Sequence, residues 1–515
     1  MDYKNIAASL MMPRLQIDKF KEYEDYKFYI KKLIDLGVSS FCLFGRVNLS
    51  DVRNTISELN NHAERELLYS ADLEYGLKMR FNEGTAFPHA MAQGKTKDYK
   101  LTFLIAQLIA QEAKNLGIHF NFAPVSDINS NPDNPIINIR SFGEDAELVG
   151  LHSAAYIKGL HEVGMLSCAK HFPGHGETSV DSHLELPTIE FDIERLREIE
   201  FKPFIKSIEN GVDSIMVGHL SVPALGTKQY PASLSKSVID ILRNELKFEG
   251  LVIPDALDMH AVADSFDSTL AAELALQAGN DLLLLPEDVE MAIEGVENLI
   301  KKDAQLLKQA ENSLEKVNKK FNWVKTKALP NNIVFNEDYY LKNEKFSLQV
   351  ARKAIELDIK EVLIPLNTES QVAAFAFLQR DEDVMQASHF FNFMQQALES
   401  NFDFAYINEN IEEKDLIGLR EGIEDAEVII FAYFYKSIAY HGSIGITDKL
   451  YSITQRMAMG KPIINIFFGN PYISENLPAE LTIKTFSDTL SSMAAATMVL
   501  TGKELIDEDK MPSMN

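Results

Sequence analysis

The chain has 515 residues, which is too long for one compact core, and two domains of unequal size are expected. Acidic residues outnumber basic ones by 76 to 50, and the net charge of −26 disfavours nucleic acid and anionic membrane surfaces as partners, since both need a basic stripe. Although 46% of the residues are hydrophobic, no stretch approaches the ~20 apolar residues of a membrane span.

Short apolar runs alternate with amphipathic stretches between about residues 28 and 300. The runs predict strands at 39–44, 68–71, 119–123, 165–169, 214–217, 251–253 and 281–285. The stretches between them predict helices at 99–116, 146–163, 192–210, 235–248 and 268–278. Strands separated by helices of this length form parallel βαβ units, and seven or eight such units predict a (β/α)8 barrel of the TIM type.

Polar residues repeatedly follow the predicted strands. They are Asp72 and Glu74, Asp127, Lys170 and His171, His219, and Asp255. In a barrel, the carboxyl ends of the strands carry the active site. We therefore expect these side chains to gather at one rim.

A second alternation of strands and helices begins near residue 340. Residues 287–325 are helical and rich in lysine, and the Ala-Leu-Pro-Asn-Asn-Ile run that follows is typical of a linker. Further strands are predicted at 361–365, 373–378, 404–407, 428–434 and 463–468. The sequence thus predicts a barrel domain over 1–325, a linker over 326–340 and a smaller doubly wound α/β domain over 341–515. No phosphate-binding Gly-x-Gly-x-x-Gly run occurs in the second domain.

Two local features concern location and redox chemistry. The first 13 residues lack the basic and apolar regions of a secretory signal, which predicts a cytoplasmic protein. The two cysteines, Cys42 and Cys168, both lie in apolar runs, and we expect buried free thiols.

Residues 170–187 carry the densest chemistry of the chain. They read Lys-His-Phe-Pro-Gly-His-Gly-Glu-Thr-Ser-Val-Asp-Ser-His-Leu-Glu-Leu-Pro and begin where a predicted strand ends. A solvated loop has no need of three histidines in so short a segment. One interpretation is a metal-dependent hydrolase with His171, His175 and His183 as ligands. However, a proline and a glycine break the helix on which His-x-x-x-His ligation normally depends.

This segment resembles the signature of family 3 glycoside hydrolases, in the branch of the β-N-acetylglucosaminidases. That signature runs Lys-His-Phe-Pro-Gly-His-Gly-Asp-Thr, followed by Asp-Ser-His and Leu-Pro. Other segments resemble family motifs in the same order, at 84–88, 121–127, 139–143, 231–235 and 250–259. The resemblance covers most of residues 1–300 and implies a two-domain glycoside hydrolase that removes terminal β-linked N-acetylglucosamine with no cofactor.

The resemblance also implies roles for single residues. Cleavage with retention needs a carboxylate on one face of the sugar and a proton donor on the other. Asp255 occupies the position of the family's nucleophile, although a post-strand aspartate taken alone is as often a helix N-cap. The proton donor implied is His183, with Asp181 as its partner. An imidazole titrates near neutrality, and a neighbouring carboxylate orients the ring and raises its pKa.

Five residues are expected to bind the sugar or line its pocket: Asp72, Arg140, Lys170, His171 and His219. The first four match sugar-binding positions of the family, while a lysine or arginine taken singly could equally pair with nearby acids. His219 ends another strand and could instead be a core histidine.

The sequence departs from the family pattern at three positions. Tyr75 and Leu77 stand where the family has glycine and arginine, which predicts a reshaped corner around Asp72. Glu177 replaces an aspartate in the loop that precedes Asp181.

The resemblance implies cell-wall recycling fragments, GlcNAc-anhydromuropeptides, as substrates. The partner expected is therefore a small carbohydrate, with no nucleic acid and no membrane insertion. Two other activities on the same fold stay open, a β-N-acetylglucosaminide phosphorylase and a β-glucosidase. A sugar-binding protein without catalysis is an alternative from another class.

Overall fold

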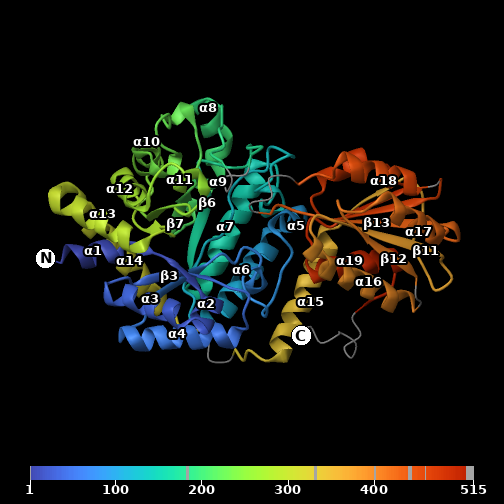
Figure 1. The fold of residues 1–515 in the computed structure, drawn as a ribbon, viewed down its shortest axis with the longest axis horizontal. Helices are drawn as coiled ribbons and strands as arrows, with labels where there is room; N and C mark the ends of the chain where they lie inside the picture. The colour runs from blue at the N-terminus through green and yellow to red at the C-terminus, as the bar shows by residue number, and fades with distance from the viewer. Residues whose placement is uncertain are drawn as a thin grey trace. The chain divides into compact units, whose positions relative to one another are not determined.

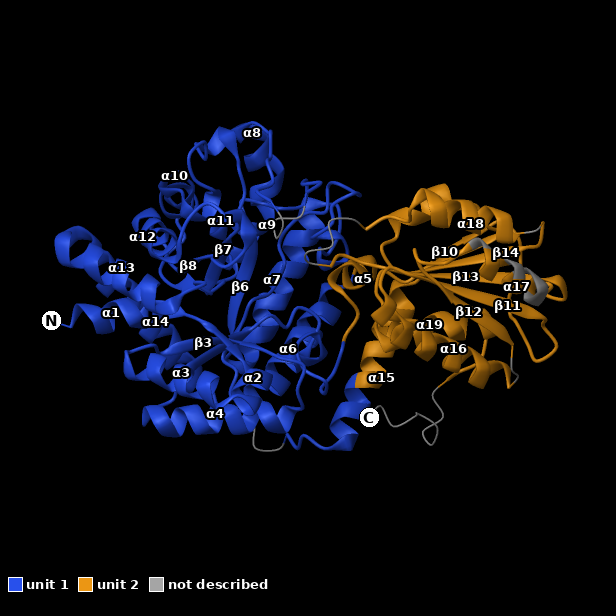
Figure 2. Ribbon diagram, in the orientation of Figure 1, with its two compact units in different colours: residues 1–86, 98–343 blue, residues 87–97, 344–515 orange. Residues whose placement is uncertain are grey.

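The computed structural model describes residues 2–180, 185–329, 333–399, 402–438, 444–458 and 460–505. The chain divides into two compact units (Figure 2). Unit 1 comprises Met1–Ala86 and Asp98–Asn343, and unit 2 comprises Phe87–Lys97 and Glu344–Asn515.

The short segment Phe87–Lys97 belongs to unit 2, although the sequence places it within the barrel domain. Its first residue packs edge-on against Phe346, with ring centroids 6.4 Å apart. The backbone N–H of His89 donates to Ser487 Oγ at 3.3 Å. The second contact joins residues 398 positions apart, and local sequence patterns carry no signal for contacts at such separations.

Unit 1 contains a ring of parallel strands. Seven of them pair in chain order: β2 (Arg14–Gln16), β3 (Ser40–Phe44), β4 (Leu68–Ala71), β5 (Phe120–Asn121), β6 (Leu166–Phe172), β7 (Ser214–Val217) and β8 (Leu251–Pro254). β1 (Met11–Met12) pairs with β9 (Leu283–Leu284), also in parallel.

The ring closes through β9. The N–H of Asp281 donates to the carbonyl of Val252 in β8 at 2.7 Å, while β9 itself pairs with β1. Pro13 separates β1 from β2, so one N-terminal strand is divided between two neighbours. The predicted TIM-type barrel is thereby confirmed, and this divided strand is the one that the sequence analysis misses.

The helices of unit 1 lie outside the ring of strands (Figure 1). They are α1 (Tyr3–Ser9), α2 (Ile17–Glu22), α3 (Glu24–Asp35), α4 (Leu49–Ala63), α6 (Tyr99–Asn115), α7 (Ala146–Val163), α8 (Ile193–Arg195), α9 (Phe201–Glu209), α10 (Lys236–Asp240), α11 (His260–Ala263), α12 (Ser268–Ala278), α13 (Val289–Lys302) and α14 (Ala304–Lys325). Short turns of 3-10 helix lie at η1 (Leu77–Met79), η2 (Asn138–Arg140), η4 (Pro223–Leu225) and η5 (Ala232–Leu234).

Local signals set the helix ends. α7 begins after Asp145, whose side chain accepts from the N–H of Leu148, and it ends at Gly164 in the left-handed region. These are the predicted bounds. The helices expected at 192–210 and 235–248 are instead interrupted by π-helical turns, η3 (Leu196–Glu200) and η6 (Ile241–Glu245).

The inside of the barrel is apolar and includes both cysteines. Cys42 of β3 and Cys168 of β6 are buried free thiols, which confirms the expectation. Burial raises the pKa of each thiol to about 12, so neither is a reactive thiolate near neutral pH.

Unit 2 is built on a six-stranded sheet in the order β10-β15-β14-β13-β11-β12. The strands are β10 (Glu356–Ile359), β11 (Val372–Leu378), β12 (Asp403–Ile407), β13 (Val428–Tyr435), β14 (Ile463–Gly469) and β15 (Leu481–Lys484). All neighbours are parallel except β10 and β15.

Helices cover both faces of this sheet, as a doubly wound domain requires. α16 (Val384–Leu398) and α19 (Leu490–Thr501) pack on one face, and α17 (Glu413–Glu424) and α18 (Asp448–Ala458) pack on the other. The remaining helices are α5 (Ala90–Lys95), α15 (Glu337–Ala354), η7 (Asp381–Asp383) and η8 (Tyr472–Asn476).

The strand predicted at 361–365 is wrong. The chain forms its edge strand earlier, at β10, whose four residues are all exposed and give no apolar run to detect. Val362, within the predicted run, is 80% exposed. β15 is also absent from the prediction. Among the described residues, no helix combines the length and apolar character needed to span a membrane.

Candidate active site

Five charged side chains from β6 itself and from the segments that follow β4 and β5 contact one another. We call them the charge cluster: Asp72, Glu74, Arg80, Arg140 and Lys170. Lys170 Nζ donates to Asp72 Oδ1 at 2.7 Å and lies 2.8 Å from Glu74 Oε1. Arg140 donates twice to Glu74, from Nη2 at 2.7 Å and from Nε at 3.0 Å. Arg80 donates to the other oxygen of Asp72.

The charges of this cluster are fixed by their mutual contact. Burial alone would raise the pKa of Asp72 and of Glu74, but Lys170 and the two arginines hold both well below their usual range. Burial would likewise lower the pKa of Lys170, but the two carboxylates raise it. All five groups therefore stay ionised through the neutral range.

Exposure separates the residues that a ligand can reach from those that support them. Asp72 and Arg140 keep 17% and 21% of their side chains exposed, whereas Lys170 and Glu74 keep 3% and 8%. A sugar hydroxyl can therefore accept from Arg140 and donate to Asp72, while Lys170 and Glu74 hold these two in place.

The sequence analysis expects Leu77, which stands where the family has arginine, to leave the corner around Asp72 without a cation. The structure does place a cation there. Leu77 is fully buried, so its position does not line the pocket. Arg80, at the end of η1, supplies the cation instead. The sequence analysis places Glu74 at the rim but gives it no role, and it does not select Arg80. Only the tertiary contacts show that both residues belong to the charge cluster.

His171 is held by a buried carboxylate. Asp127 has no exposed surface and accepts from His171 Nδ1 at 2.7 Å. The same carboxylate accepts the backbone N–H of His171 at 3.0 Å and that of His175 at 2.7 Å. Burial would raise the pKa of Asp127, but the contact with His171 lowers it. Because Nδ1 donates to Asp127, Nε2 is the nitrogen that His171 presents to a ligand.

The loop after β6 is anchored to the segment that follows β5. Asn134 Nδ2 donates to the carbonyl of His175 at 2.8 Å, and Asn131 Nδ2 donates to that of Glu177 at 3.0 Å. The His175 ring is buried, and burial lowers its pKa to about 4, so it is neutral at pH 7. His175 and its neighbours thus shape the loop.

Gly176 allows the closest approach in this loop. A Cβ atom at this position would overlap the carbonyl oxygen of Ile128. We expect Gly176→Ala to displace the loop and to lower kcat/KM on an aryl glycoside by about 100-fold, since a 1 Å misplacement costs that much. Gly445→Ala is the control, because no atom lies within 4 Å of a Cβ there. Equal activity of the two variants would show that the loop position is not needed.

Asp255 directly follows β8 at the barrel rim. Its N–H donates to the carbonyl of Val217 at 2.8 Å, and its Oδ1 accepts from the N–H of Ala256 at 2.8 Å. The first bond links the Asp255 segment to the end of β7, and the second orients the carboxylate within the segment.

His219 contacts this segment from the β7 side. Its Nε2 lies 2.8 Å from the carbonyl of Ala256, and its Nδ1 lies 2.7 Å from Ser233 Oγ. A carbonyl accepts only, so Nε2 donates and Nδ1 accepts from the serine hydroxyl. The ring has no exposed surface. His219 is therefore a buried histidine bonded to the segment of Asp255, which favours the alternative of a core histidine.

The two residues assigned to proton transfer, Asp181 and His183, lie outside the described residues. His183, the third histidine of the alternative metal site, therefore has no described position. Within the described ranges, no group of three or more His, Cys, Asp and Glu side chains could hold a metal ion.

The charge cluster and Asp255 thus lie on one parallel barrel. Residues 14–319 match the model of the glycosyl hydrolase family 3 N terminal domain. The chain belongs to glycoside hydrolase family 3, as the resemblance of residues 170–187 implies, and it is a glycoside hydrolase.

Several curated relatives are 32–34% identical to this chain over the parts that align. A β-hexosaminidase of Psychromonas ingrahamii is 32% identical over 326 residues, which cover 61% of this chain and 92% of the relative. A β-hexosaminidase of Hydrogenovibrio crunogenus is 32% identical over 51% of this chain and 76% of the relative. For β-hexosaminidase A of Pseudoalteromonas piscicida, the match at 34% identity covers 48% of this chain and 44% of the relative, less than half its length.

Two solved structures extend the similarity to both units. A family 3 β-N-acetylglucosaminidase from Paenibacillus sp. FPU-7 matches with a TM-score of 0.84 and 25% identity, over 98% of this chain and 97% of that one. The β-glucoside phosphorylase BglX matches with a TM-score of 0.82 over 99% and 94% of the two chains. At 19% identity, the second match shows the fold alone.

Proposed function

We propose that this protein is a retaining exo-β-N-acetylglucosaminidase that hydrolyses terminal β-linked N-acetylglucosamine. The observation that carries the proposal is the charge cluster, which presents Asp72 after β4 and Arg140 in η2, after β5, in the same barrel that presents Asp255 after β8. The similarity to curated β-hexosaminidases and to the Paenibacillus β-N-acetylglucosaminidase supports the choice of sugar.

The reaction has two steps. In the first, the Asp255 carboxylate attacks the anomeric carbon, and the bond to the leaving oxygen breaks as His183 gives that oxygen a proton. In the second, His183 takes a proton from water, the water oxygen attacks the same carbon, and the bond to Asp255 breaks. Asp181 orients the His183 ring, Asp72, Arg140 and His171 hold the sugar, and Lys170 holds the Asp72 carboxylate in place.

The natural substrates that we propose are peptidoglycan fragments, namely GlcNAc-anhydromuropeptides in the cytoplasm. The motif of residues 170–187 supports this assignment, because it resembles the β-N-acetylglucosaminidase branch of the family. Release of GlcNAc from such fragments by the purified protein, measured by mass spectrometry, is the expected result.

A comparison of aryl glycosides tests the activity. We expect 4-nitrophenyl β-N-acetylglucosaminide to be hydrolysed in preference to the β-glucoside, at a rate that added phosphate does not change. The first sugar product seen by NMR is the β-anomer, because two displacements at the same carbon retain configuration. A sugar 1-phosphate as product would assign a phosphorylase, and a preference for the glucoside would assign a β-glucosidase.

A further inference from the structure

Two arginines stack on one aromatic ring at the carboxyl end of β3. Phe44 is the last residue of this strand, and its ring centroid lies 4.1 Å from Cζ of Arg14 and 4.9 Å from Cζ of Arg80. Both distances are within the ~6 Å range of cation–π attraction. We call these three residues the arginine stack. Because Arg14 begins β2 and Arg80 ends η1, the stack joins three segments of unit 1.

Two cations can share this ring because each has its own carboxylate. Arg14 Nη2 donates to Asp258 Oδ2 at 2.7 Å, and Arg80 donates to Asp72 of the charge cluster. Charge-assisted bonds of this kind are stronger than bonds between neutral groups. Contacts therefore run without a break from Asp72, through the arginine stack, to Asp258.

Asp258 belongs to the loop of Asp255, which it follows by three residues. The N–H of Asp255 ties this loop to β7 at 2.8 Å, and the N–H of Leu257 ties it to the carbonyl of Leu284 in β9 at 3.0 Å. The bond from Arg14 adds an anchor in β2, from a residue 244 positions away in the chain. The loop that carries the carboxylate is thus held by three different strands.

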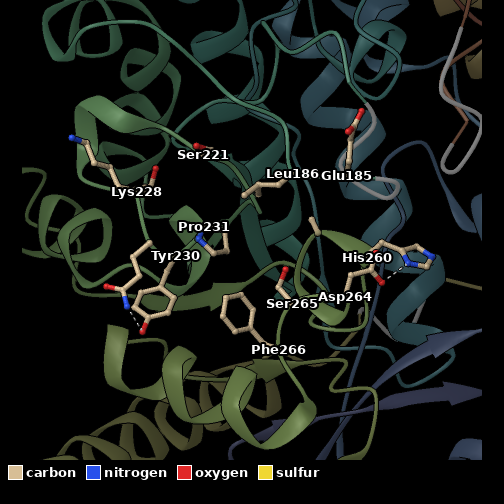
Figure 3. A pocket seen from close by; sticks show the side chains of 13 residues that line it. Glu185, Leu186, Ser221, Lys228, Tyr230, Pro231, His260, Asp264, Ser265 and Phe266 are labelled. Atoms are coloured by element: carbon tan, nitrogen blue, oxygen red, sulfur yellow. Dashed lines mark hydrogen bonds and ion pairs between the residues drawn. The ribbon is translucent and has the colours of Figure 1, made fainter.

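A second charged pair after β8 stays within one short helix. His260 Nδ1 lies 3.0 Å from Oδ1 of Asp264, four residues along at the end of α11. Figure 3 shows this pair at the wall of a pocket whose lining includes the loops after β7 and β8. An exposed pair between neighbouring turns contributes little and fixes no other segment. The pair of Asp258 differs, because it connects the Asp255 loop to another strand.

The place of the Asp255 loop relative to Asp72 sets the distance of attack. Under the proposed function, Asp72 holds the sugar while Asp255 attacks the anomeric carbon. Asp72 is itself fixed by Arg80 and Lys170. Loss of the anchor at Asp258 therefore moves the nucleophile rather than the sugar, and a misplacement of 1 Å costs about 100-fold in rate.

We propose that Arg14 is a positioning residue for the nucleophile, which holds the Asp255 loop in place through Asp258 and is itself held by stacking on Phe44. This inference rests on the proposed function and deepens it, since it assigns a residue of the first strands to the step of attack. It predicts that loss of Arg14 slows the attack by Asp255 without weakening the binding of the sugar.

A ring-fluorinated β-N-acetylglucosaminyl fluoride measures this attack directly. Asp255 forms a bond to the anomeric carbon, fluoride leaves, and the glycosyl-enzyme is hydrolysed slowly, so the adduct can be followed by mass spectrometry. We expect Arg14→Met to lower the rate constant of adduct formation about tenfold and to leave the half-saturating concentration within about twofold of wild type. Arg14→Lys should recover most of this loss, because it keeps a cation opposite Asp258.

Arg197→Met is the matched control. Arg197 donates to both oxygens of Glu245, at 2.7 and 2.8 Å, in an exposed pair, and we expect its loss to change neither quantity by more than about twofold. Asp258→Ala removes the same bond from the other side and should reproduce the loss seen in Arg14→Met. The double variant of Arg14 and Asp258 should lose no more than either single variant, because the two side chains act as one unit.

The outcomes separate the two proposals. A wild-type protein that forms no adduct and hydrolyses no β-N-acetylglucosaminide overturns the proposed function, and the inference with it. An adduct on Asp255 that forms equally fast in wild type and in Arg14→Met overturns the inference alone. A loss that appears only in the half-saturating concentration, that Arg197→Met shares, or that adds up in the double variant means that Arg14 acts in another way, and this also overturns the inference.

Discussion

Asp255→Asn lowers kcat on an aryl β-N-acetylglucosaminide by a factor on the order of 10⁴, the cost of removing a central group of a catalytic unit. The amide has nearly the shape of the carboxylate and can still accept the N–H of Ala256, which Asp255 Oδ1 accepts at 2.8 Å. It cannot form the covalent bond to the anomeric carbon. The loss therefore reports the nucleophile rather than a change of fold.

The control for this variant is Asp240→Asn. Asp240 is an exposed aspartate that pairs with Lys236 at 2.6 Å on α10, and its loss is expected to leave kcat within about twofold of wild type. Incubation with a fluorinated glycosyl fluoride, whose second step is slow, should add the sugar to the peptide that contains Asp255. Unchanged turnover by Asp255→Asn, or an adduct on another residue, would refute the mechanism.

Glu74→Gln destabilises the barrel by about 3 to 5 kcal/mol, because it breaks a buried ion pair from one side. Glu74 is the carboxylate that receives both nitrogens of Arg140 and also contacts Lys170. Without it, three buried or half-buried cations of the charge cluster share only Asp72. Binding of the sugar weakens as well, since Arg140 loses the group that fixes its orientation.

The free energy of unfolding of the barrel can be measured selectively, because the chain has a single tryptophan. Trp323 lies in α14 of unit 1, so its fluorescence during urea unfolding reports the barrel. The matched control is Glu58→Gln, which removes a carboxylate that also contacts two cations, Lys27 at 3.0 Å and Lys31 at 2.7 Å, but at the surface. There we expect a loss of only ~0–1 kcal/mol. Equal losses for the two variants would contradict the argument from burial.

The decrease in the free energy of unfolding that Glu74→Gln causes should depend on pH in one direction. The cations hold the pKa of Glu74 far below the value of about 4.3 that it has in an unfolded chain. A carboxylate whose pKa is lower in the folded state adds stability above the unfolded pKa and loses it as the pH falls. The difference in the free energy of unfolding between wild type and Glu74→Gln should therefore be constant from about pH 6 to 8 and shrink below about pH 4.

Much of the fold is predictable because its signals are local. Short apolar runs separated by amphipathic helices predict the barrel, and the strands Leu68–Ala71 and Ser214–Val217 are predicted to the residue. The prediction fails where the pattern is short or exposed, as in β1, β2 and the edge strand β10. Such strands are defined by their partners rather than by their own composition.

The candidate site shows the same division. The polar residues after the strands are visible in the sequence, and the parallel barrel brings Asp72 into contact with Lys170 across 98 positions. The sequence gives no sign that Arg80 takes over the cation near Asp72, or that Asp127 binds His171. It also cannot show that both nitrogens of His219 are bound within the protein.

The sequence by itself determines the barrel, the family and the set of residue types available for chemistry, because periodicity and motif order are properties of neighbouring residues. Only the tertiary structure decides which charges pair, where Phe87–Lys97 belongs, and that Arg14 and Arg80 stack on the ring of Phe44. These depend on contacts between distant segments, whose energies come from burial and mutual neutralisation. No local pattern encodes them.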